Sequence, residues 1–397
     1  MTFAEIAASL GIREYPGELN EIYAKMSQTN VPACDLSLID SLQEKYNFFA
    51  DLYDVVRENA VAVNTNAACS TWIKVATSYA KQVDIKAAKA LPVPQPDGTV
   101  FTQMLPYYIV LGQIPDALAK YLACGFEETE VLGLFATFRG SLRKVEKLTG
   151  IIGLNQTYYS WLNNFTKAVI FKTEGFQFEI KEFPKTVLYL RNRETGKLLP
   201  MRLSGLICVG GEQPVGSYGY ADESGAFTPT FSEDEENYYG HGVFDNIVDS
   251  EKNAYPKTKW ECVVRPGDNC LSIHIPSGTD ISTEATMRAC KSAVKIVRKF
   301  NPEKASNVIY GSSWILNPKL KDMLGENARI SQFLECFTKY PMQDANGNAV
   351  FNFVFSGRPE NLKELPEETS LQRKIKALYL SGGCLHKYSG VIYIEEE

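Results

Sequence analysis

The residue types best suited to chemistry stand near the end of one expected strand. Residues 270–275 alternate between apolar and polar side chains, which predicts a strand with Ser272 and His274 on the same face. Pro276 cannot continue ladder pairing, so the strand is expected to end there. A histidine takes up or releases a proton near neutral pH, so His274 is a candidate general base. The alternative is a histidine that is simply hydrogen-bonded between a sheet and a helix.

The segment after this strand predicts a short loop that leads directly into a helix. Gly278 lies in the loop, and Ser282 fits the N-cap of a helix expected over residues 282–300. Such a turn gathers unpaired backbone N–H groups at the positive end of a helix dipole, where a phosphate or pyrophosphate can bind. An ordinary strand-to-helix turn has the same pattern, and the negative charge of Asp280 counts against phosphate binding.

The composition indicates a large globular chain with no preference for polyanions. Of the 397 residues, 45% are apolar, which is enough for a large core, and the length favours two domains. The 41 basic and 47 acidic residues give a net charge of −6, which argues against a protein that mainly binds nucleic acid or anionic membrane. Neither a secretory signal nor a membrane segment is expected, so a cytoplasmic protein is predicted.

Nine cysteines and three histidines are spread along the chain without the spacing of metal ligands. No Cys-x-x-Cys pair occurs. Scattered single cysteines are typical of small buried residues in a reducing compartment, and not of a disulfide framework or a zinc site. We therefore expect neither disulfides nor a metal centre.

The chain changes character near residue 165. Apolar residues recur at three- and four-residue steps before this point, which predicts helices, whereas alternating and β-branched runs follow it. We therefore expect the fold class α+β, with an all-helical domain over residues 1–165 and a mixed β-sheet domain with flanking helices over residues 166–397. Beyond the helix at 282–300, the expected elements are a strand at 307–310, a helix at 318–337, a strand at 350–355, a helix at 369–381 and a strand at 391–394.

Several short motifs, taken in order, resemble a bacterial family of two-domain acyltransferases. The motifs are Gly240-His-Gly-Val-Phe-Asp245, Arg265-Pro-Gly-Asp268, His274-Ile-Pro-Ser-Gly278, Ser312-Ser-Trp-Ile-Leu-Asn-Pro318 and Leu365-Pro-Glu-Glu-Thr-Ser-Leu-Gln-Arg373. In that family a helical N-terminal domain precedes a C-terminal domain of the GNAT superfamily. The similarity covers residues 180–395 in ordered motifs and the helical half more diffusely.

The resemblance implies that an acyl-coenzyme A binds where two adjacent parallel strands, here 270–275 and 307–310, open into a V. The pantetheine would pair with the backbone of the first strand, and the pyrophosphate would lie on the amides of the following loop. The residues assigned in this way to cofactor binding are Ile273, Ile275, Ser277, Gly278 and Thr279. The acceptor amine attacks the thioester directly, so the reaction needs a general base and an acid for the leaving thiolate, but no protein nucleophile and no metal.

The sequence departs from the superfamily at two points. The usual Gln/Arg-x-x-Gly-x-Gly/Ala loop is replaced by Ile275-Pro-Ser-Gly-Thr-Asp280, which has one glycine and an acid. The tyrosine that often protonates the thiolate is missing from residues 317–331, so Ser313, Ser331 or water would have to replace it. We therefore take His274 and Ser313 as the candidate catalytic residues, although Ser313 also fits a helix-entry residue that bonds to backbone.

Two further residues are candidates for the substrate site. Trp314 would line an acyl pocket, but a large aromatic side chain at a strand-to-helix junction is also typical of a core. Glu261, on a strand expected at 259–264, would lie beside the cleft as a base, or simply face water.

The sequence thus predicts an N-acyltransferase that moves an acyl group from acyl-coenzyme A to a small-molecule amine by direct attack. Its partners would be the co-substrate and the amine acceptor, with neither nucleic acid nor membrane. The alternative is a non-catalytic ligand-binding or regulatory protein that retains a degenerate GNAT fold. The single-glycine loop, Asp280 and the missing tyrosine favour this alternative.

Overall fold

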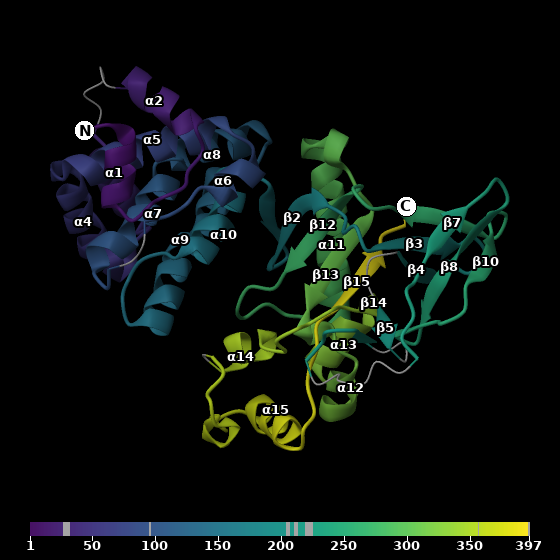
Figure 1. Cartoon of the computed structure of the whole chain (residues 1–397). Coiled ribbons are helices and arrows are strands. Elements are labelled where there is room, and N and C mark those ends of the chain that lie inside the picture. The colour runs from purple at the N-terminus through teal and green to yellow at the C-terminus, as the bar shows by residue number, and fades with distance from the viewer. Residues whose placement is uncertain are drawn as a thin grey trace. The chain divides into compact units, whose positions relative to one another are not determined.

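The computed structural model describes residues 1–26, 32–94, 97–203, 207–209, 213–218, 225–355 and 357–395. The chain divides into two compact units, Met1–Phe171 and Lys172–Glu397. The first unit is helical and the second is built on β-sheets with helices (Figure 1), so the α+β fold class expected from the sequence is confirmed. No helix in the described part of the chain is long and apolar enough to cross a bilayer.

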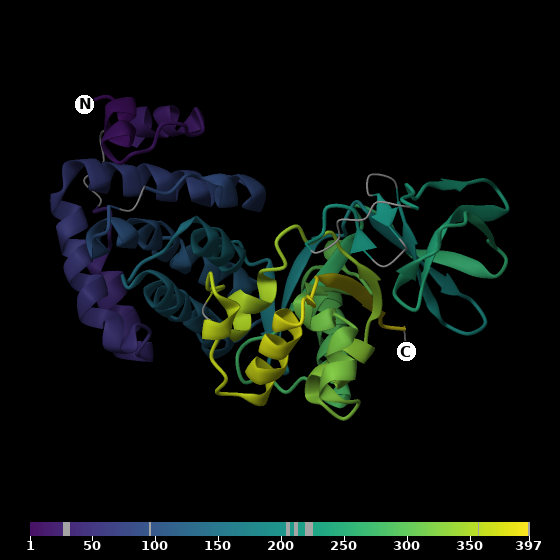
Figure 2. The ribbon, with the colours of Figure 1, turned by 60° about the horizontal axis from the view of Figure 1, so that its bottom comes forward.

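The first unit packs its helices around one apolar core (purple to blue in Figure 2). Its longest helix, α9, carries the buried stripe Phe135, Phe138 and Leu142, and it ends at Gly150, whose φ of 78° suits glycine. The helices are α1 (Phe3–Ser9), α2 (Glu18–Met26), α3 (Leu36–Tyr46), α4 (Tyr53–Thr65), α5 (Ala67–Gln82), α6 (Ile85–Ala90), α7 (Val100–Leu111), α8 (Ile114–Ala123), α9 (Glu128–Thr149) and α10 (Gln156–Thr166).

A six-stranded mixed sheet forms the centre of the second unit. In spatial order its strands are β1 (Ile170–Thr173), β2 (Phe176–Glu182), β12 (Asn269–His274), β13 (Val308–Ser313), β15 (Tyr388–Tyr393) and β14 (Thr338–Pro341). Strands β12 and β13 are parallel, whereas β2 pairs antiparallel with β12, and β15 pairs antiparallel with both β13 and β14. Parallel neighbours require a crossover, which here contains α11 (Thr283–Phe300).

Helices α11 and α13 (Arg329–Glu335) cover one face of this sheet. Helix α11 buries a stripe of small residues. Outside this stripe, the Oγ of Ser292 on the same helix lies 2.8 Å from the Oγ1 of Thr173 on β1. Phe333 of α13 stacks on Phe176 of β2, with 6.4 Å between ring centroids. Figure 1 shows α11 alongside β12 and β13. The expected helix at 282–300 is therefore present and positions the loop that precedes it.

The other face of the six-stranded sheet packs against a second, antiparallel sheet. Its strands are β10 (Asn253–Pro256), β8 (Asn237–Phe244), β4 (Leu198–Arg202), β3 (Val187–Asn192) and β11 (Trp260–Val264), with β7 (Phe231–Glu233) and β9 (Ile247–Val248) paired to β8. A further pair is β5 (Cys208–Val209) with β6 (Gln213–Pro214). Tyr189 of β3 contacts Tyr340 of β14, and its hydroxyl donates to the carbonyl of Thr338 at 2.8 Å.

One expected helix is divided in two. The prediction of a continuous helix at 318–337 is wrong, because α12 (Lys319–Leu324) ends at Gly325 and α13 begins at Arg329. Gly325 has a φ of 87°, which ends a helix. Strand β14 then follows α13 directly, and the sequence pattern had not indicated it.

The strand expected at 350–355 is also wrong, since α14 (Ala349–Val354) occupies this segment. Phe353 is 77% exposed, while Phe351 and Phe355 are buried. In a strand these three rings would share a face. In a helix Phe351 and Phe355, four residues apart, share a face, and Phe353 points away from it. Phe351 packs on Tyr379 of α15 (Ser370–Leu380) at 4.7 Å between centroids, so tertiary packing selected the helix.

Candidate functional site

The parallel strands β12 and β13 part at their C-terminal ends. Their mutual pairing ends at Ser272 and Tyr310. Beyond these residues β12 stays paired with β2 as far as His274, and β13 stays paired with β15 as far as Ser313. Both strands thus continue with their outer partners, but among the described residues they do not pair with each other beyond this point. We call the diverging segments, Ile273–His274 and Gly311–Ser313, the fork.

The register places His274 and Ser312 on one face of the fork. Ser272 and Tyr310 are paired side by side, so their side chains share a face. His274 and Ser312 each lie two residues further along and therefore share that face at corresponding positions. Ser313 is one residue further and lies on the opposite face. The structure thus places the two predicted catalytic residues, His274 and Ser313, on opposite faces of the fork, and Ser312 shares the face of His274 instead.

His274 is paired with an acidic residue of the neighbouring strand. Its Nε2 lies 3.2 Å from Oε2 of Glu179, whose side chain is only 13% exposed. A carboxylate only accepts hydrogen bonds, so this contact requires the hydrogen on Nε2 and makes Nδ1 the acceptor atom of a neutral ring. Sequence reasoning missed Glu179. The alternation of residues 176–183 indicates its face, but only the antiparallel register with β12 brings it to His274.

The other serines considered as acids are engaged or enclosed. Ser313 Oγ accepts the N–H of Ile315 at 3.3 Å and thereby caps the short 3-10 helix η3 (Trp314–Leu316). Ser331 is fully buried within α13, and its hydroxyl has no partner among the described residues. Trp314 is 6% exposed in η3, so its placement fits the core alternative.

Glu261 lies away from the fork. It is on β11, which belongs to the second sheet, and its carboxylate pairs with Arg191 at 3.2 Å and with Arg193 at 2.8 Å. The expectation that this residue borders the same opening as His274 assumed that strands adjacent in sequence lie in one sheet. The antiparallel partner of β11 is β3, and β12 pairs with β2 instead.

The loop between β12 and α11 has the geometry expected for an anion site. Gly278 adopts a φ of 82° at the turn, and Ser277 and Gly278 are exposed. The hydroxyl of Thr279 donates to the carbonyl of Gly175 at 3.0 Å and so anchors the loop to the β1–β2 turn. Ser282 caps α11 by accepting the N–H of Ala285 at 3.3 Å. The exposed backbone of Ser277 and Gly278 therefore lies directly before the first turn of a well-capped helix.

The acid in this loop is already hydrogen-bonded. Oδ1 of Asp280 accepts the N–H of Ser282 at 3.1 Å and lies 3.4 Å from Arg329. These two groups, the Ser282 N–H first, lower the pKa of Asp280, so it is ionised at neutral pH. The positive charge of Arg329 offsets that negative charge next to the loop.

No activated thiol or cluster of metal ligands accompanies the fork. Burial raises the pKa of Cys270, on β12, to about 12, so the thiol is protonated at neutral pH. All nine cysteines are free, which agrees with the absence of Cys pairs in the sequence. Among the described residues no group of three or more His, Cys, Asp or Glu side chains is arranged to hold a metal ion.

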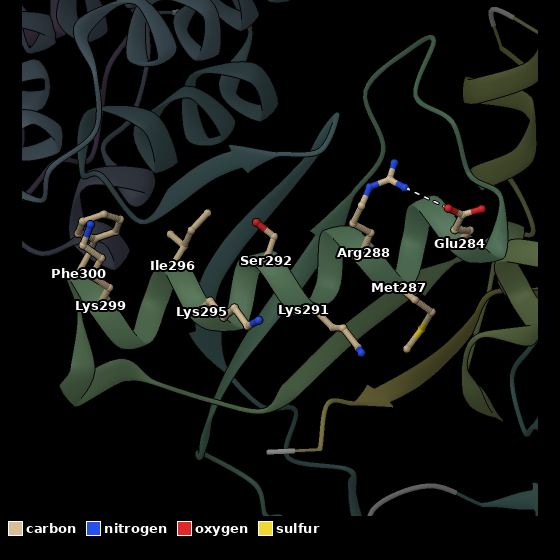
Figure 3. A pocket seen from close by; sticks show the side chains of 9 residues that line it. All are labelled: Glu284, Met287, Arg288, Lys291, Ser292, Lys295, Ile296, Lys299 and Phe300. Carbon is tan, nitrogen blue, oxygen red and sulfur yellow. Dashed lines mark ion pairs between the residues drawn. The ribbon is translucent and has the colours of Figure 1, made fainter. Parts of the chain in front are cut away.

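A separate groove of about 750 Å³ is lined by side chains of α11 (Figure 3). Four cationic side chains line it: Arg288, Lys291, Lys295 and Lys299. Arg288 pairs with Glu174 at 2.9 Å and with Glu284 at 3.6 Å. The groove contains none of the residues that the sequence analysis singled out.

Comparisons with known proteins agree with this architecture. Two solved structures share the fold over 100% of this chain and 100% of their own. One is an acyltransferase in complex with decanoyl-CoA and teicoplanin, with a TM-score of 0.66 and 16% identity. The other is an acyltransferase mutant in complex with octanoyl-CoA, with a TM-score of 0.65 and 15% identity. No curated protein matches the sequence.

The resemblance inferred from the ordered motifs is thereby confirmed: a helical unit precedes a GNAT-like mixed sheet. A family model described as GNAT-like C-terminal domain matches residues 176–392, more than half of the 397 residues and including every strand of the fork. The chain belongs to this family of GNAT-like C-terminal domains.

Proposed function

We propose that the protein transfers an acyl group from an acyl-coenzyme A to the amine of a small molecule. The observation that carries this proposal is the fork: two parallel strands stop pairing after Ser272 and Tyr310 although both continue with their outer partners. An extended amide-containing chain such as pantetheine can pair with an exposed strand edge in the same way as a peptide. The edge of β12 at Ile273–His274 supplies such groups.

The loop after β12 fits the phosphates of coenzyme A. The turn at Ser277, Gly278 and Thr279 stands before the N-terminus of α11, where backbone N–H groups and the helix dipole favour negative charge. Ile273, on β12, and Ile275, directly after the end of that strand, precede this turn. The fork and the loop therefore follow one another along the chain in the same order as the thioester, the pantetheine and the pyrophosphate of an acyl-coenzyme A.

His274 is suited to take the proton from an attacking amine. Its Nε2–H is held by Glu179, which makes Nδ1 the basic atom of the neutral ring. In direct attack the amine nitrogen bonds to the thioester carbon, the amine proton passes to Nδ1, and the C–S bond breaks. The ring then returns its proton to solvent, since the His274 side chain is 31% exposed.

A small-molecule acceptor is supported by one structural relative. The acyltransferase at 16% identity is described in complex with teicoplanin as well as decanoyl-CoA. We infer a small molecule with a free amine as the acceptor class for this chain and coenzyme A thioesters, medium-chain ones included, as donors. That residues 1–165 form a separate domain is also part of this proposal, and this segment holds none of the groups named above.

Calorimetric titration tests the co-substrate. The full-length protein is titrated with decanoyl-CoA, acetyl-CoA and free coenzyme A, and thiol release is then followed with hydroxylamine as a small nucleophilic probe. We expect saturable binding of a thioester and a hydroxylamine-dependent release of coenzyme A that is faster than the spontaneous reaction without protein. Absence of binding to all three at millimolar concentration would contradict the proposal.

The second candidate, a non-catalytic binding protein with a degenerate fold, predicts a different pattern. The observation that favours it is the ionised Asp280 next to the phosphate loop. It would bind a thioester or coenzyme A without accelerating thiol release, and substitution of His274 would then leave all measured rates unchanged.

A further inference from the structure

A chain of three hydroxyl groups leads from the fork into the core of the second unit. Ser389 Oγ lies 2.8 Å from Ser312 Oγ and 2.9 Å from Tyr310 Oη. Ser312 is exposed, whereas Ser389 is fully buried and Tyr310 is 4% exposed. The cross-strand pair Ser312–Ser389 and the diagonal neighbour Tyr310 all lie on the face of the sheet that carries His274.

The hydrogens in this chain run in one direction. A hydroxyl has a single hydrogen to donate, and Ser389 donates its own to Ser312. The contact between Tyr310 and Ser389 therefore requires Tyr310 as the donor. Ser312 accepts from Ser389 and keeps its own hydrogen for another acceptor at the fork. Hydrogen bonds arranged head to tail polarise each other, which makes the last hydroxyl a better donor.

The buried end of the chain lies beside a positive charge that has no counter-ion among the described residues. Arg202 of β4 is 0% exposed, and none of its three guanidinium nitrogens has a hydrogen-bond partner among the described residues. Its guanidinium carbon lies 5.0 Å from the ring centroid of Tyr340, the residue paired directly with Ser389. Tyr310 is close enough to act electrostatically on Arg202. Burial lowers the pKa of Arg202, which expresses the cost of an unpaired charge in the core.

We propose that Ser312 is the acid that protonates the leaving thiolate. Ser389, Tyr310 and Arg202 are positioning residues. The first two pass a proton towards Ser312, and Arg202 stabilises the negative charge that is left on Tyr310. The proposal rests on the proposed acyl transfer and names a residue for the role of the tyrosine missing from residues 317–331. It replaces Ser313, which is occupied as a cap on the other face.

The proton balance of the step is complete. As the C–S bond breaks, sulfur takes the hydrogen of Ser312, Ser312 takes that of Ser389, and Ser389 takes that of Tyr310. The phenolate formed at Tyr310 becomes a counter-anion for Arg202, which has no hydrogen-bond partner among the described residues of the resting protein. The amine proton meanwhile resides on His274. After the products leave, water returns a proton to Ser312, the chain runs backwards, and His274 releases its proton to solvent.

The test compares full-length variants with decanoyl-CoA as donor and hydroxylamine as acceptor. Ser312→Ala removes the terminal donor, Ser312→Thr keeps a hydroxyl, and Tyr310→Phe removes the far end of the chain. Ser306→Ala, two residues before the start of β13, is the matched control because its hydroxyl accepts the N–H of Val308 and lies at the end of the strand opposite to the fork. For each variant the dissociation constant of decanoyl-CoA, kcat and the solvent deuterium isotope effect on kcat are measured.

We expect Ser312→Ala to lower kcat about 100-fold at an unchanged dissociation constant, which is the size of a lost general acid. Ser312→Thr should recover most of kcat, and Tyr310→Phe should reduce kcat and the isotope effect together, which a purely structural change would not do. Ser306→Ala should match the wild type. Equal kcat values for Ser312→Ala and Ser306→Ala, in a wild type that turns over, overturn the relay alone. A wild type that binds no thioester overturns the proposed function and the relay with it.

Discussion

His274 and Ser312 occupy corresponding positions on the two diverging strands of the fork, each two residues beyond the last paired residues, Ser272 and Tyr310. They share one face of the sheet, and each is bonded to a residue of its outer neighbouring strand, Glu179 for His274 and Ser389 for Ser312. A proton acceptor and a proton donor thus flank the point where a thioester would lie. Acyl transfer to an amine needs both groups.

Substitution of the His274–Glu179 pair tests the basic side of the fork. His274→Asn should lower kcat for decanoyl-CoA and hydroxylamine by about 100-fold or more, because the general base is lost. Glu179→Gln should have a smaller effect of about tenfold, because the imidazole keeps an acceptor that orients the ring but loses its charged partner. Glu182→Gln, at the exposed end of the same strand, is the control. A Glu179→Gln variant with wild-type kcat would show that the pair is only structural.

Gly278 should be required for coenzyme A and not for its pantetheine part. Alanine finds no steric obstacle within 4 Å there, but the φ of 82° costs a non-glycine residue roughly 1 kcal/mol or more, so the turn and its amides shift. Gly278→Ala should therefore weaken binding of decanoyl-CoA about fivefold or more and leave binding of decanoyl-pantetheine unchanged. Gly325→Ala carries the same strain at a φ of 87° away from the loop and serves as control. Equally weakened binding of both ligands would show that Gly278 does not act through the phosphates of coenzyme A.

Arg202 should raise kcat and lower the stability of the folded protein. Replacing a buried, unpaired cation by an apolar side chain of similar size is often neutral or stabilising. Arg202→Met should therefore keep or raise the melting temperature while it lowers kcat about tenfold, an effect comparable to that of Tyr310→Phe. The double variant should be no slower than either single one if both act through one phenolate. A melting temperature that falls by several degrees together with an unchanged kcat contradicts this role.

His386 should make the protein less stable in mild acid. Burial lowers the pKa of His386 from 6.5, opposed by the hydrogen bond of Nε2 to the carbonyl of Tyr218 at 2.6 Å and by the charge of Asp344. Below pH 6.5 the unfolded imidazole binds a proton that the folded one does not, so the free energy of unfolding falls with a slope of up to about 1.4 kcal/mol per pH unit. Above pH 6.5 both forms are neutral and the effect vanishes.

Urea unfolding at about pH 7.5 and about pH 5.5 measures this slope in the wild type and in His386→Gln. The substitution should reduce the difference between the two conditions, whereas His241→Gln should retain it because His386 is still present. An identical difference in the wild type and His386→Gln would show that other groups cause the acid dependence.

Local patterns were sufficient for the elements that hold the site. Alternation over 270–275, the stop at Pro276 and the cap at Ser282 are each decided within a few residues, and β12 and α11 lie where these signals indicated. The segment 350–355 shows the limit of such patterns. Its alternation of side chains is typical of a strand, but the segment forms a helix in which Phe351 packs on Tyr379. That contact joins residues far apart in the sequence, so the local pattern could not predict it.

The sequence by itself determined the fold class, the order of the family motifs and the position of the loop before α11, because these depend on neighbours in the chain. The tertiary structure alone decided which side chains share the fork. Glu179 reaches His274 over 95 residues and Ser389 reaches Ser312 over 77, and each contact is set by strand pairing. A period of two says which residues share a face of one strand, but not which strand lies beside it. For that reason Glu261 was expected at the fork and lies on another sheet, whereas Ser312 was found only from the register.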